Sequence, residues 1–265
     1  MTLPSIQRSI LTILKLGGEL VDAPADLART ADAVAALSQR TALAVVHGGG
    51  KAIDAELARR GLTPEKRDGI RITDAATLDA VVAVLAGAAN TALVAALAAR
   101  GVRAVGLTGA DASLGIAERV TGMETAAGGV VDPGLVGRPV GKAGGELLHL
   151  LCGQGYVPVI ASIGMTRDGA LLNINADVMA AHVAAAAGAE RLLVAGSTPG
   201  VLDSVGKRID ALDTKALEAL LGDGTATAGM IAKLRACQSA RDAGVNDVRI
   251  VDGRSAGFET GTALR

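Results

Sequence analysis

Short apolar runs that end in glycine and lead into helical patterns constrain this chain more than any other feature. In the clearest case, residues 42–46 are apolar, His47-Gly48-Gly49-Gly50 follows, and a helical pattern continues after Lys51. Glycine has no Cβ atom, so its backbone accepts positive φ and approaches a ligand closely. The helix start that follows offers unpaired N–H groups and a partial positive charge. The run therefore predicts an anion site and leaves the kind of anion open.

Six apolar runs predict strands, and helical patterns lie between and after them. The predicted strands are residues 11–16, 42–47, 102–107, 157–162, 192–195 and 247–251. The predicted helices are residues 26–39, 52–60, 75–100, 142–153, 176–187, 214–220 and 230–243. Continuous apolar strands that alternate with helices are typical of a parallel sheet buried on both faces. We therefore predict an α/β fold, a three-layer αβα sandwich with a central, mostly parallel sheet.

Two segments break this rhythm, and one helix differs from the rest. Residues 115–131 and 171–175 predict short antiparallel excursions. Helix 75–100 is apolar round most of its surface, which predicts either deep burial or cover by another subunit. Since no linker divides the chain, we expect a single domain over residues 1–265. Its N-terminal lobe of about residues 1–170 and C-terminal lobe of about residues 171–265 would share the sheet.

Composition excludes nucleic acid as a partner. The 26 basic and 27 acidic residues nearly cancel, so the chain has no broad basic field. Tyr156 and Phe258 are the only aromatic residues. Proteins that bind single strands usually stack bases on aromatic rings, and this chain has almost none to offer.

Cysteine usage and hydropathy predict a cytoplasmic protein with no membrane partner. Cys152 and Cys237 lie far apart, with no CxxC spacing and no visible signal peptide, so we expect reduced thiols. The most apolar stretch, residues 81–99, is interrupted by Gly87, Asn90 and Thr91. It therefore stays short of the roughly 18 uninterrupted apolar residues of a membrane span.

Three basic residues lie where an anion would bind. Lys15 ends an apolar run directly before Leu16-Gly17-Gly18; its burial is costly unless an anion compensates, and the alternative is a lysine that snorkels from the sheet edge. Lys233 lies in the first turns of a helix, where a cation opposes the helix dipole, which favours an anionic partner. Arg71 lies on a loop-like segment, either as a bidentate carboxylate ligand or as an ordinary surface arginine.

The segment Asn173-Ile174-Asn175-Ala176-Asp177 combines two amides with a carboxylate. The two asparagines occupy alternate strand positions and face the same side, and Asp177 opens an alanine-rich helix. Helix capping accounts for one of these three polar residues. For the others we expect amides that hold a small ligand and an aspartate that orients nearby lysines.

The chain lacks the sequence patterns of several other kinds of active or binding site. The chain has no GxxxxGK[ST] and no GxGxxG after a strand, so it matches neither the P-loop nor the usual dinucleotide fingerprint. A GxSxG match at residues 253–257 has no histidine after it, as a nucleophile elbow requires. The histidines, His47, His149 and His182, show no metal-ligand spacing, and we expect no protein-bound metal.

Five motifs taken in order resemble the amino-acid kinase family, over nearly the whole chain from residue 11 to about residue 252. They are Lys15-Leu16-Gly17-Gly18, His47-Gly48-Gly49-Gly50, Gly69-Ile70-Arg71-Ile72-Thr73, Asn173-Ile174-Asn175-Ala176-Asp177 and Gly229-Met230-Ile231-Ala232-Lys233. The arginine segment and the NxNAD segment are similar to the branch of the family that acts on N-acetyl-L-glutamate.

This resemblance implies phosphoryl transfer from ATP to the side-chain carboxylate of N-acetyl-L-glutamate, an early step of arginine biosynthesis. Such transfer needs positioning and charge neutralisation more than a covalent catalyst, and Mg²⁺ would be held by the nucleotide phosphates. The N-terminal lobe would bind the acceptor and form the dimer, and the C-terminal lobe would bind the nucleotide. The implied catalytic residues are Lys15, Lys233 and Asp177; the implied substrate-binding residues are Gly49, Gly50, Arg71, Asn173 and Asn175; and the implied nucleotide- or phosphate-binding residues are Gly17, Gly18, Gly48, Ser197, Gly200, Thr227 and Met230.

Departures from the family pattern bear on nucleotide binding and assembly. Ser197 begins a turn where the family usually has an aspartate; serine keeps a hydrogen-bonding oxygen and loses the charge. Residues 255–265 are a short C-terminus where a terminal helix is typical. About ten residues precede the first strand, whereas arginine-inhibited members carry an additional N-terminal helix. We therefore expect a homodimer, insensitive to arginine and joined around helix 75–100.

Two alternatives remain open from the sequence. One is another kinase of the same family that acts on a different small carboxylate or carbamate. The other is a non-catalytic binding member, suggested by the missing aspartate and the short tail. Retention of both Lys15 and Lys233 argues against the binding member.

Overall fold

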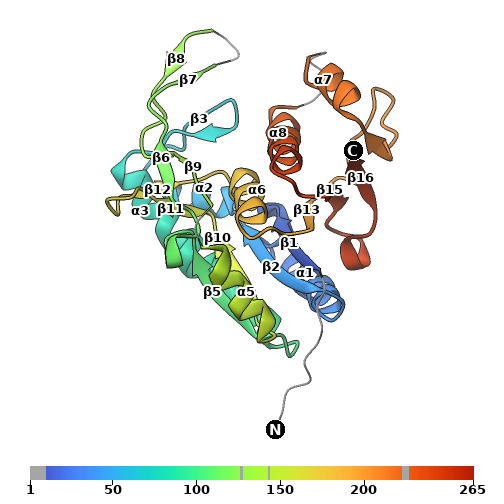
Figure 1. The fold of residues 1–265 in the computed structure, drawn as a ribbon. Coiled ribbons are helices and arrows are strands. Elements are labelled where there is room, and N and C mark those ends of the chain that lie inside the picture. The colour runs from blue at the N-terminus through green and yellow to red at the C-terminus, as the bar shows by residue number, and fades with distance from the viewer. Residues whose placement is uncertain (1–9, 126–127, 143, 223–226) are drawn as a thin grey trace.

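An eight-stranded sheet forms the centre of the computed structural model, which describes residues 10–125, 128–142, 144–222 and 227–265 (Figure 1). The strand order is β14-β16-β15-β13-β1-β2-β10-β5. Neighbouring strands are parallel except for β15 and β16, which are antiparallel. The strands are β1 (Leu11–Leu16), β2 (Ala42–His47), β5 (Ala104–Thr108), β10 (Val157–Ala161), β13 (Arg191–Gly196), β14 (Ala211–Leu212), β15 (Asp247–Asp252) and β16 (Gly261–Leu264).

Helices cover both faces of the sheet, which confirms the predicted three-layer α/β fold. One face packs against α1 and α4, and the other packs against α5, α6 and α8. The helices are α1 (Pro24–Ser38), α2 (Gly50–Arg59), α3 (Ala75–Val82), the π-helical segment η2 (Ala83–Ala89), α4 (Asn90–Ala98), α5 (Gly145–Gly153), α6 (Ala176–Ala186), α7 (Thr214–Gly222) and α8 (Ala228–Asp242). Short 3-10 turns are η1 (Gly18–Leu20), η3 (Asp111–Ser113) and η4 (Ala256–Phe258).

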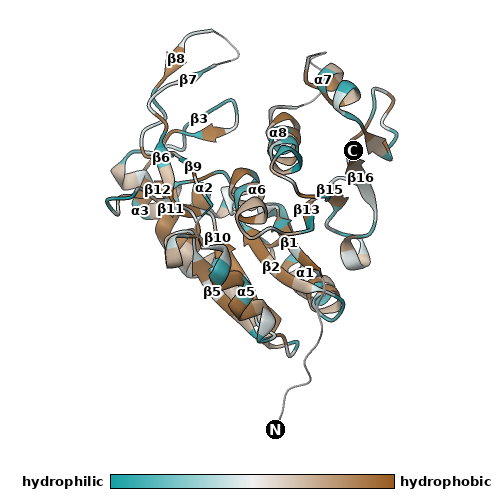
Figure 2. Ribbon diagram, in the orientation of Figure 1, coloured by the Kyte–Doolittle hydropathy of each residue, from teal (hydrophilic) through white to brown (hydrophobic). Residues whose placement is uncertain are grey.

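Alternation along the strands fixes which face each side chain joins. In β1, Leu11 and Ile13 enter the core under α5, α6 and α8, whereas Leu14 and Leu16 enter the core under α1 and α4. The central strands are mostly apolar, as the hydropathy colouring shows (Figure 2), with Lys15 and His47 as polar exceptions near their carboxyl ends. Because successive side chains of a strand point to opposite faces, the same alternation turns Lys15 toward the α6 side.

The described residues also form four small antiparallel strand pairs outside the central sheet. They are β3 (Lys66–Arg67) with β4 (Ile70–Arg71), β6 (Ala117–Arg119) with β9 (Gly137–Pro139), β7 (Met123–Glu124) with β8 (Val130–Val131), and β11 (Ile163–Met165) with β12 (Leu171–Asn173). The last three confirm the antiparallel excursions predicted at residues 115–131 and 171–175. In Figure 1 the β7–β8 hairpin extends furthest from the sheet.

Several sequence predictions need correction. Arg71 lies on the two-residue strand β4, where the sequence predicted a loop. Strand β5 begins at residue 104 and not at 102, and α5 begins at Gly145, because Gly144 has a φ of 82° that a continuing helix does not accept. The C-terminal segment is ordered into η4 and β16, and neither β16 nor its partner β14 was predicted. Residues 1–9, on which the expectation of arginine insensitivity depends, lie outside the described residues.

The elements α3, η2 and α4 form one helical stretch, Ala75–Ala98, whose length and hydropathy would suffice to cross a membrane. Only 39% of its most apolar window is buried inside the molecule. Its buried face packs Val81 and Leu85 beside α2, and Leu93 and Leu97 against the sheet. The stretch therefore packs on the sheet as part of the sandwich, and its second apolar face is left uncovered by the described residues.

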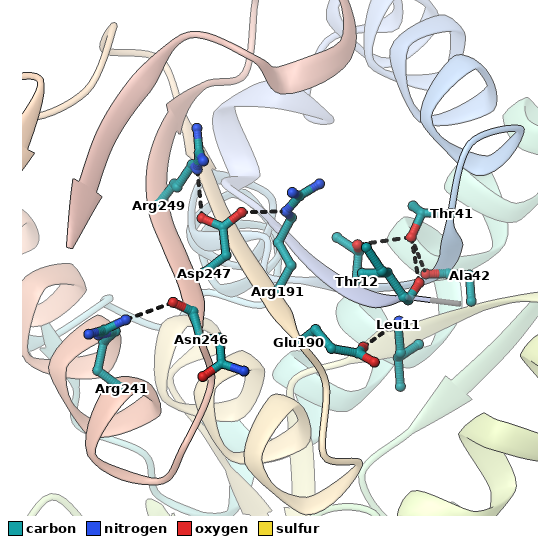
Figure 3. A network of polar contacts seen from close by, with 11 residues as sticks. Leu11, Thr12, Thr41, Ala42, Glu190, Arg191, Arg241, Asn246, Asp247 and Arg249 are labelled. Carbon is teal, nitrogen blue, oxygen red and sulfur yellow. Dashed lines mark hydrogen bonds and ion pairs between the residues drawn. The ribbon is translucent and has the colours of Figure 1, made fainter. Parts of the chain in front are cut away.

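A polar network joins the amino ends of the central strands (Figure 3). The Leu11 N–H donates to Glu190 Oε2 at 2.6 Å, and the hydroxyls of Thr12 and Thr41 are 3.1 Å apart. Asp247 accepts from Arg191 Nε at 2.6 Å and from Arg249 Nε at 2.7 Å. Burial alone raises the pKa of Asp247, but these two arginines outweigh it and lower the pKa.

Candidate active site

At the carboxyl edge of the sheet, one carboxylate lies between two ammonium groups. Lys15 comes from the end of β1, Asp177 from the first turn of α6, and Lys233 from α8. Lys15 Nζ is 2.8 Å from Asp177 Oδ1, and Lys233 Nζ is 3.2 Å from Asp177 Oδ2. The exposed side-chain fractions are 6% for Lys15, 8% for Asp177 and 21% for Lys233. The three predicted catalytic residues thus meet in one nearly enclosed cluster with two positive charges and one negative charge.

The pKa shifts of this cluster reflect its surplus of positive charge. Burial lowers the pKa of Lys15, but the charge and hydrogen bond of Asp177, together with smaller effects of Lys233 and Glu19, outweigh it and raise the pKa above its usual value. Burial, together with the charge of Lys15, lowers the pKa of Lys233. Burial raises the pKa of Asp177, yet the two lysines outweigh it and lower the pKa. Lys233 is therefore the cation whose charge the folded chain compensates least.

Two glycine turns from neighbouring strands meet beside the cluster. A Cβ atom on Gly18 would lie 3.2 Å from Gly49 Cα and from Gly50 N, which is tighter than an ordinary contact. A Cβ atom on Gly17 would lie 2.5 Å from the Glu19 carboxylate. Helix α2 begins at Gly50, so its first N–H groups have no partner within the helix. The predicted glycines thus form a narrow floor with backbone donors next to Lys15.

The Arg71 guanidinium is hydrogen-bonded through only one of its two terminal nitrogens among the described residues. Its Nη2 donates to Asp54 Oδ1 at 2.5 Å and to the Gly50 carbonyl at 3.2 Å. The residue is only 7% exposed, and its Nη1 is buried without a hydrogen-bond partner among the described residues. A buried guanidinium nitrogen of this kind favours an oxygen ligand, because an unpaired buried donor is costly.

The two asparagines of the NxNAD segment have different roles in the fold. Asn175 Oδ1 accepts from the N–H groups of Asp177 at 2.8 Å and Val178 at 3.2 Å, so Asn175 is the N-cap of α6. Asn173 Nδ2 donates to Thr73 Oγ1 at 3.1 Å, and Thr73 Oγ1 donates to the Arg71 carbonyl at 2.9 Å. Thr73 therefore links the asparagine segment to the arginine segment.

The remaining predicted residues lie on the α8 side of the cluster or in the turn after β13. Thr227 caps α8, and its Oγ1 accepts from Met230 N at 3.3 Å. Ser197 and Gly200 lie in the turn after β13. Gly200 has a φ of 135°, and a Cβ atom there would lie 2.6 Å from Thr262 Oγ1, so this glycine packs the turn against β16. Nucleotide roles for these residues stay predictions.

Sequence reasoning missed four residues that border the site. Asp54 and Thr73 hold Arg71, Glu19 lies over Gly17, and Asn90 touches His47. The position of Glu19 directly after Gly17-Gly18 was a usable signal. Asn90 was noted only as a break in an apolar stretch, and no local pattern links it to a histidine 43 positions earlier.

Comparison with known proteins adds an independent observation. The model of the amino acid kinase family matches residues 11–252. The chain belongs to the amino acid kinase family. This confirms the family predicted from the five motifs.

Members of the amino acid kinase family with known names are similar to the chain over most of its length. An acetylglutamate kinase of Parvibaculum lavamentivorans is 44% identical over 214 residues, which cover 79% of this chain and 70% of that protein. An acetylglutamate kinase of Nitrobacter winogradskyi is 39% identical over 261 residues, which cover 96% of this chain and 87% of that protein.

Solved structures share the fold of this family member at lower identity. N-acetylglutamate synthase from Neisseria gonorrhoeae, solved with coenzyme A and N-acetyl-glutamate, superposes with a TM-score of 0.81 at 22% identity, covering 97% of this chain and 59% of that one. Giardia carbamate kinase superposes with a TM-score of 0.68 at 14% identity, covering 96% and 98%. At these identities the likeness supports the fold alone.

Proposed function

We propose that this chain transfers the γ-phosphoryl group of ATP to the side-chain carboxylate of N-acetyl-L-glutamate. A carboxylate oxygen attacks the γ-phosphorus, a new acyl phosphate bond forms, and the bond to the β–γ bridging oxygen breaks to release ADP. The reaction needs charge neutralisation and alignment rather than a covalent enzyme intermediate. Two relatives named acetylglutamate kinase, at 44% and 39% identity, support this choice of acceptor within the family.

One observation carries the proposal: among the described residues, Lys15 and Lys233 share a single ion-pair partner, Asp177, in a nearly enclosed site, and Glu19 adds only a weaker attraction on Lys15. Surplus positive charge in such a site is costly unless an anion joins it. Oxygen atoms of a transferring phosphoryl group supply that anion, and their negative charge is neutralised from two different elements of the fold. Asp177 holds both lysines in position, so we assign it a positioning role within the catalytic group.

The acceptor would lie on the side of Arg71 and the β2 turn. Arg71 Nη1 is the buried donor without a partner described above, and an α-carboxylate would satisfy it. Asn173, Asn175, Gly49 and Gly50 remain proposed neighbours of the same molecule, with Asn175 acting through its capping of α6. The side-chain carboxylate then points toward the glycine floor and Lys15.

The nucleotide would lie on the α8 side, with Gly17, Gly18 and Gly48 near its phosphates. The two ammonium groups and the backbone donors at the start of α2 suit phosphate oxygens. Mg²⁺, which neutralises phosphate charge in kinases, would be held by the nucleotide. Ser197, Gly200, Thr227 and Met230 are the proposed contacts to the nucleotide body.

An acceptor panel tests the function. Purified protein with ATP and Mg²⁺ is offered N-acetyl-L-glutamate, glutamate, aspartate, acetate and carbamate. Acyl phosphate is trapped as a hydroxamate, and ADP release is followed by a coupled assay. Hydroxamate with N-acetyl-L-glutamate alone supports the proposal. Turnover of a different carboxylate overturns the substrate, and binding without turnover of any acceptor overturns the kinase activity.

A non-catalytic binding role is the second candidate, because Ser197 replaces a charged family residue. Lys15→Ala separates the two roles. In a kinase this variant lowers kcat/KM far more than it weakens substrate binding, since Lys15 acts on the transition state. Equal and small effects on both quantities favour the binding role.

We also propose a homodimer joined around Ala75–Ala98. The exposed face of this stretch is made of small residues, including Ala83, Gly87, Thr91 and Ala95. Beside it, strand β5 is an edge of the sheet, and a cavity of about 300 Å³ lies between α4 and β5. A second copy of this apolar face is the natural cover. A light-scattering mass of a monomer or a hexamer would overturn the proposed dimer.

The cytoplasmic location expected from the sequence stays a prediction.

A further inference from the structure

Asn90 and His47 form a buried pair at the base of the β2 glycine turn. His47 is the last residue of β2, and Asn90 is the first residue of α4. Asn90 Nδ2 lies 3.0 Å from His47 Nε2, and His47 Nδ1 lies 3.2 Å from the Gly48 carbonyl oxygen. His47 is fully buried and Asn90 is 5% exposed. The pair therefore connects the long apolar helix to the turn that starts α2.

Backbone carbonyls determine which group of this pair donates. Asn90 Nδ2 also lies 2.9 Å from the Val159 carbonyl oxygen. A carbonyl oxygen accepts and never donates, so the amide must present its NH₂ group to Val159 and to His47. The Asn90 Oδ1 atom points toward Gly106, where any Cβ atom would collide with it. The amide thus donates to His47 Nε2, which must be the unprotonated ring nitrogen.

The second ring nitrogen then carries the proton. Burial lowers the pKa of His47 to about 4, so the ring is neutral at pH 7 and holds one proton. With Nε2 as the acceptor, that proton lies on Nδ1 and is donated to the Gly48 carbonyl. The orientation of the Gly48–Gly49 peptide group is fixed by this bond.

The π-helical segment η2 positions the Leu85 side chain against Gly49 and leads into Asn90, which contacts His47. The Asn90 N–H bonds the Leu85 carbonyl five residues earlier, the π-helical spacing. The Leu85 side chain packs on the turn, since a Cβ atom on Gly49 would lie 3.0 Å from Leu85 Cδ2. The helical turn from Leu85 of η2 to Asn90 of α4 therefore supplies an apolar contact to Gly49 and a polar contact to His47.

We infer that Asn90 and His47 are positioning residues for phosphoryl transfer: Asn90 holds His47 as the Nδ1–H tautomer, and His47 holds the Gly48–Gly50 turn in its reactive orientation. The inference concerns the turn beside Lys15, and its kinetic consequence rests on the proposed function. A peptide N–H that is tilted away from the developing charge loses most of its effect.

The tautomer is measured on the wild-type protein without substrate. Long-range ¹H–¹⁵N correlation spectra of the ¹⁵N-histidine protein distinguish the two ring nitrogens, and the His47→Gln spectrum identifies the His47 signals by their loss. We expect a protonated Nδ1. A protonated Nε2 overturns the inference and says nothing against the kinase activity. In Asn90→Asp the carboxylate only accepts, so we expect the proton to move to Nε2; Asn246→Asp, the same change at an exposed site, leaves the His47 signals unchanged.

Two histidine variants supply the kinetic readout. The amide of Asn reaches the place of Nδ1, whereas the amide of Gln reaches the place of Nε2. His47→Asn therefore keeps a donor for the Gly48 carbonyl, and His47→Gln removes it. We expect His47→Gln to lower kcat by about 10²-fold with little change in the KM for ATP, and His47→Asn to retain most of kcat. Equal losses in the two variants overturn the positioning role.

Discussion

The two edges of the central sheet each hold one carboxylate between two cations, and they differ in burial. At the amino edge, Asp247 is 26% exposed, and its partners Arg191 and Arg249 are 36% and 43% exposed (Figure 3). At the carboxyl edge, Asp177 is 8% exposed between Lys15 and Lys233. Water and salt screen the surplus positive charge at the amino edge. The surplus at the carboxyl edge is nearly enclosed; Glu19 offsets part of it, and a bound anion can offset the rest.

The difference shows how the same charge pattern serves two purposes. Arg191 of β13 donates to Asp247 of β15, so that cluster ties two neighbouring strands together. The carboxyl-edge lysines come from β1 and α8 and meet at Asp177 of α6. Burial thus distinguishes the amino-edge cluster from the carboxyl-edge cluster, which we propose as the catalytic group.

Asp177→Asn should cause the largest loss of unfolding free energy, and so the clearest difference between the carboxyl-edge and amino-edge clusters. It leaves two buried ammonium groups without a counter-charge, and breaking a buried ion pair in this way costs about 3–5 kcal/mol of unfolding free energy. Chemical denaturation measures the change, and kcat falls in parallel because both lysines lose their anchor. If Asp177→Asn lowers the unfolding free energy by less than Asp247→Asn does, burial does not distinguish the two clusters.

Lys233→Met should separate activity from stability. The pKa of Lys233 is lowered by burial and by Lys15, so its charged form is disfavoured in the folded chain. Its removal leaves the neutral Lys15–Asp177 pair, and unfolding free energy is expected to stay equal or rise. In contrast, kcat should fall by about 10²–10³-fold, as for loss of one transition-state donor. Lys215→Met on the exposed surface of α7 is the control, and a drop in stability for Lys233→Met would refute the surplus-charge interpretation.

Arg71→Lys tests the acceptor side of the carboxyl edge. A lysine keeps the charge but lacks the planar fork with which Nη2 bonds Asp54 while Nη1 stays available to a second carboxylate. We expect the KM for N-acetyl-L-glutamate to rise by an amount equivalent to about 1.5–3 kcal/mol, with the KM for ATP unchanged. Arg67→Lys, in the same hairpin and exposed, should behave like the wild type. Equal changes in both KM values would place Arg71 outside the acceptor site.

Asp247→Asn should have the smallest effect of these four variants, a slight loss of unfolding free energy. Its partners are partly exposed, so the loss in unfolding free energy is expected within about 0.2–1 kcal/mol, with kcat unchanged. The pKa of Asp247 is lowered in the folded chain from 3.8, so its contribution is present above pH 3.8 and is lost as the pH falls through the folded value. Unfolding free energies of variant and wild type should therefore converge in acid. A difference that grows in acid would show the opposite sign of linkage.

The sheet and its glycine ends were predictable, because β1 and β2 are continuous apolar runs whose ends carry Lys15 and His47-Gly48. The side of the sheet formed by β14 and β16 was not predictable from the sequence, because β16 has only four residues and includes the buried Thr262. The meeting of Lys15, Asp177 and Lys233 was inferred from a family resemblance, since residues 162 and 56 positions apart leave no local pattern. The role of Asn90 escaped detection for the same reason: its partners are set by tertiary packing.

The placement of β16 also has a consequence for the timing of folding during synthesis. Strand β14 joins the sheet through β16, although residues 211–212 leave the ribosome about fifty residues before residues 261–264. At about 5–20 residues per second, β14 waits for seconds as an unpaired segment. The strands that carry Lys15 and the β2 turn need no such delay, since β1 and β2 follow each other directly in sequence and in space. The pairing of β1 with β2 can therefore form while the C-terminal part of the sheet is still being made.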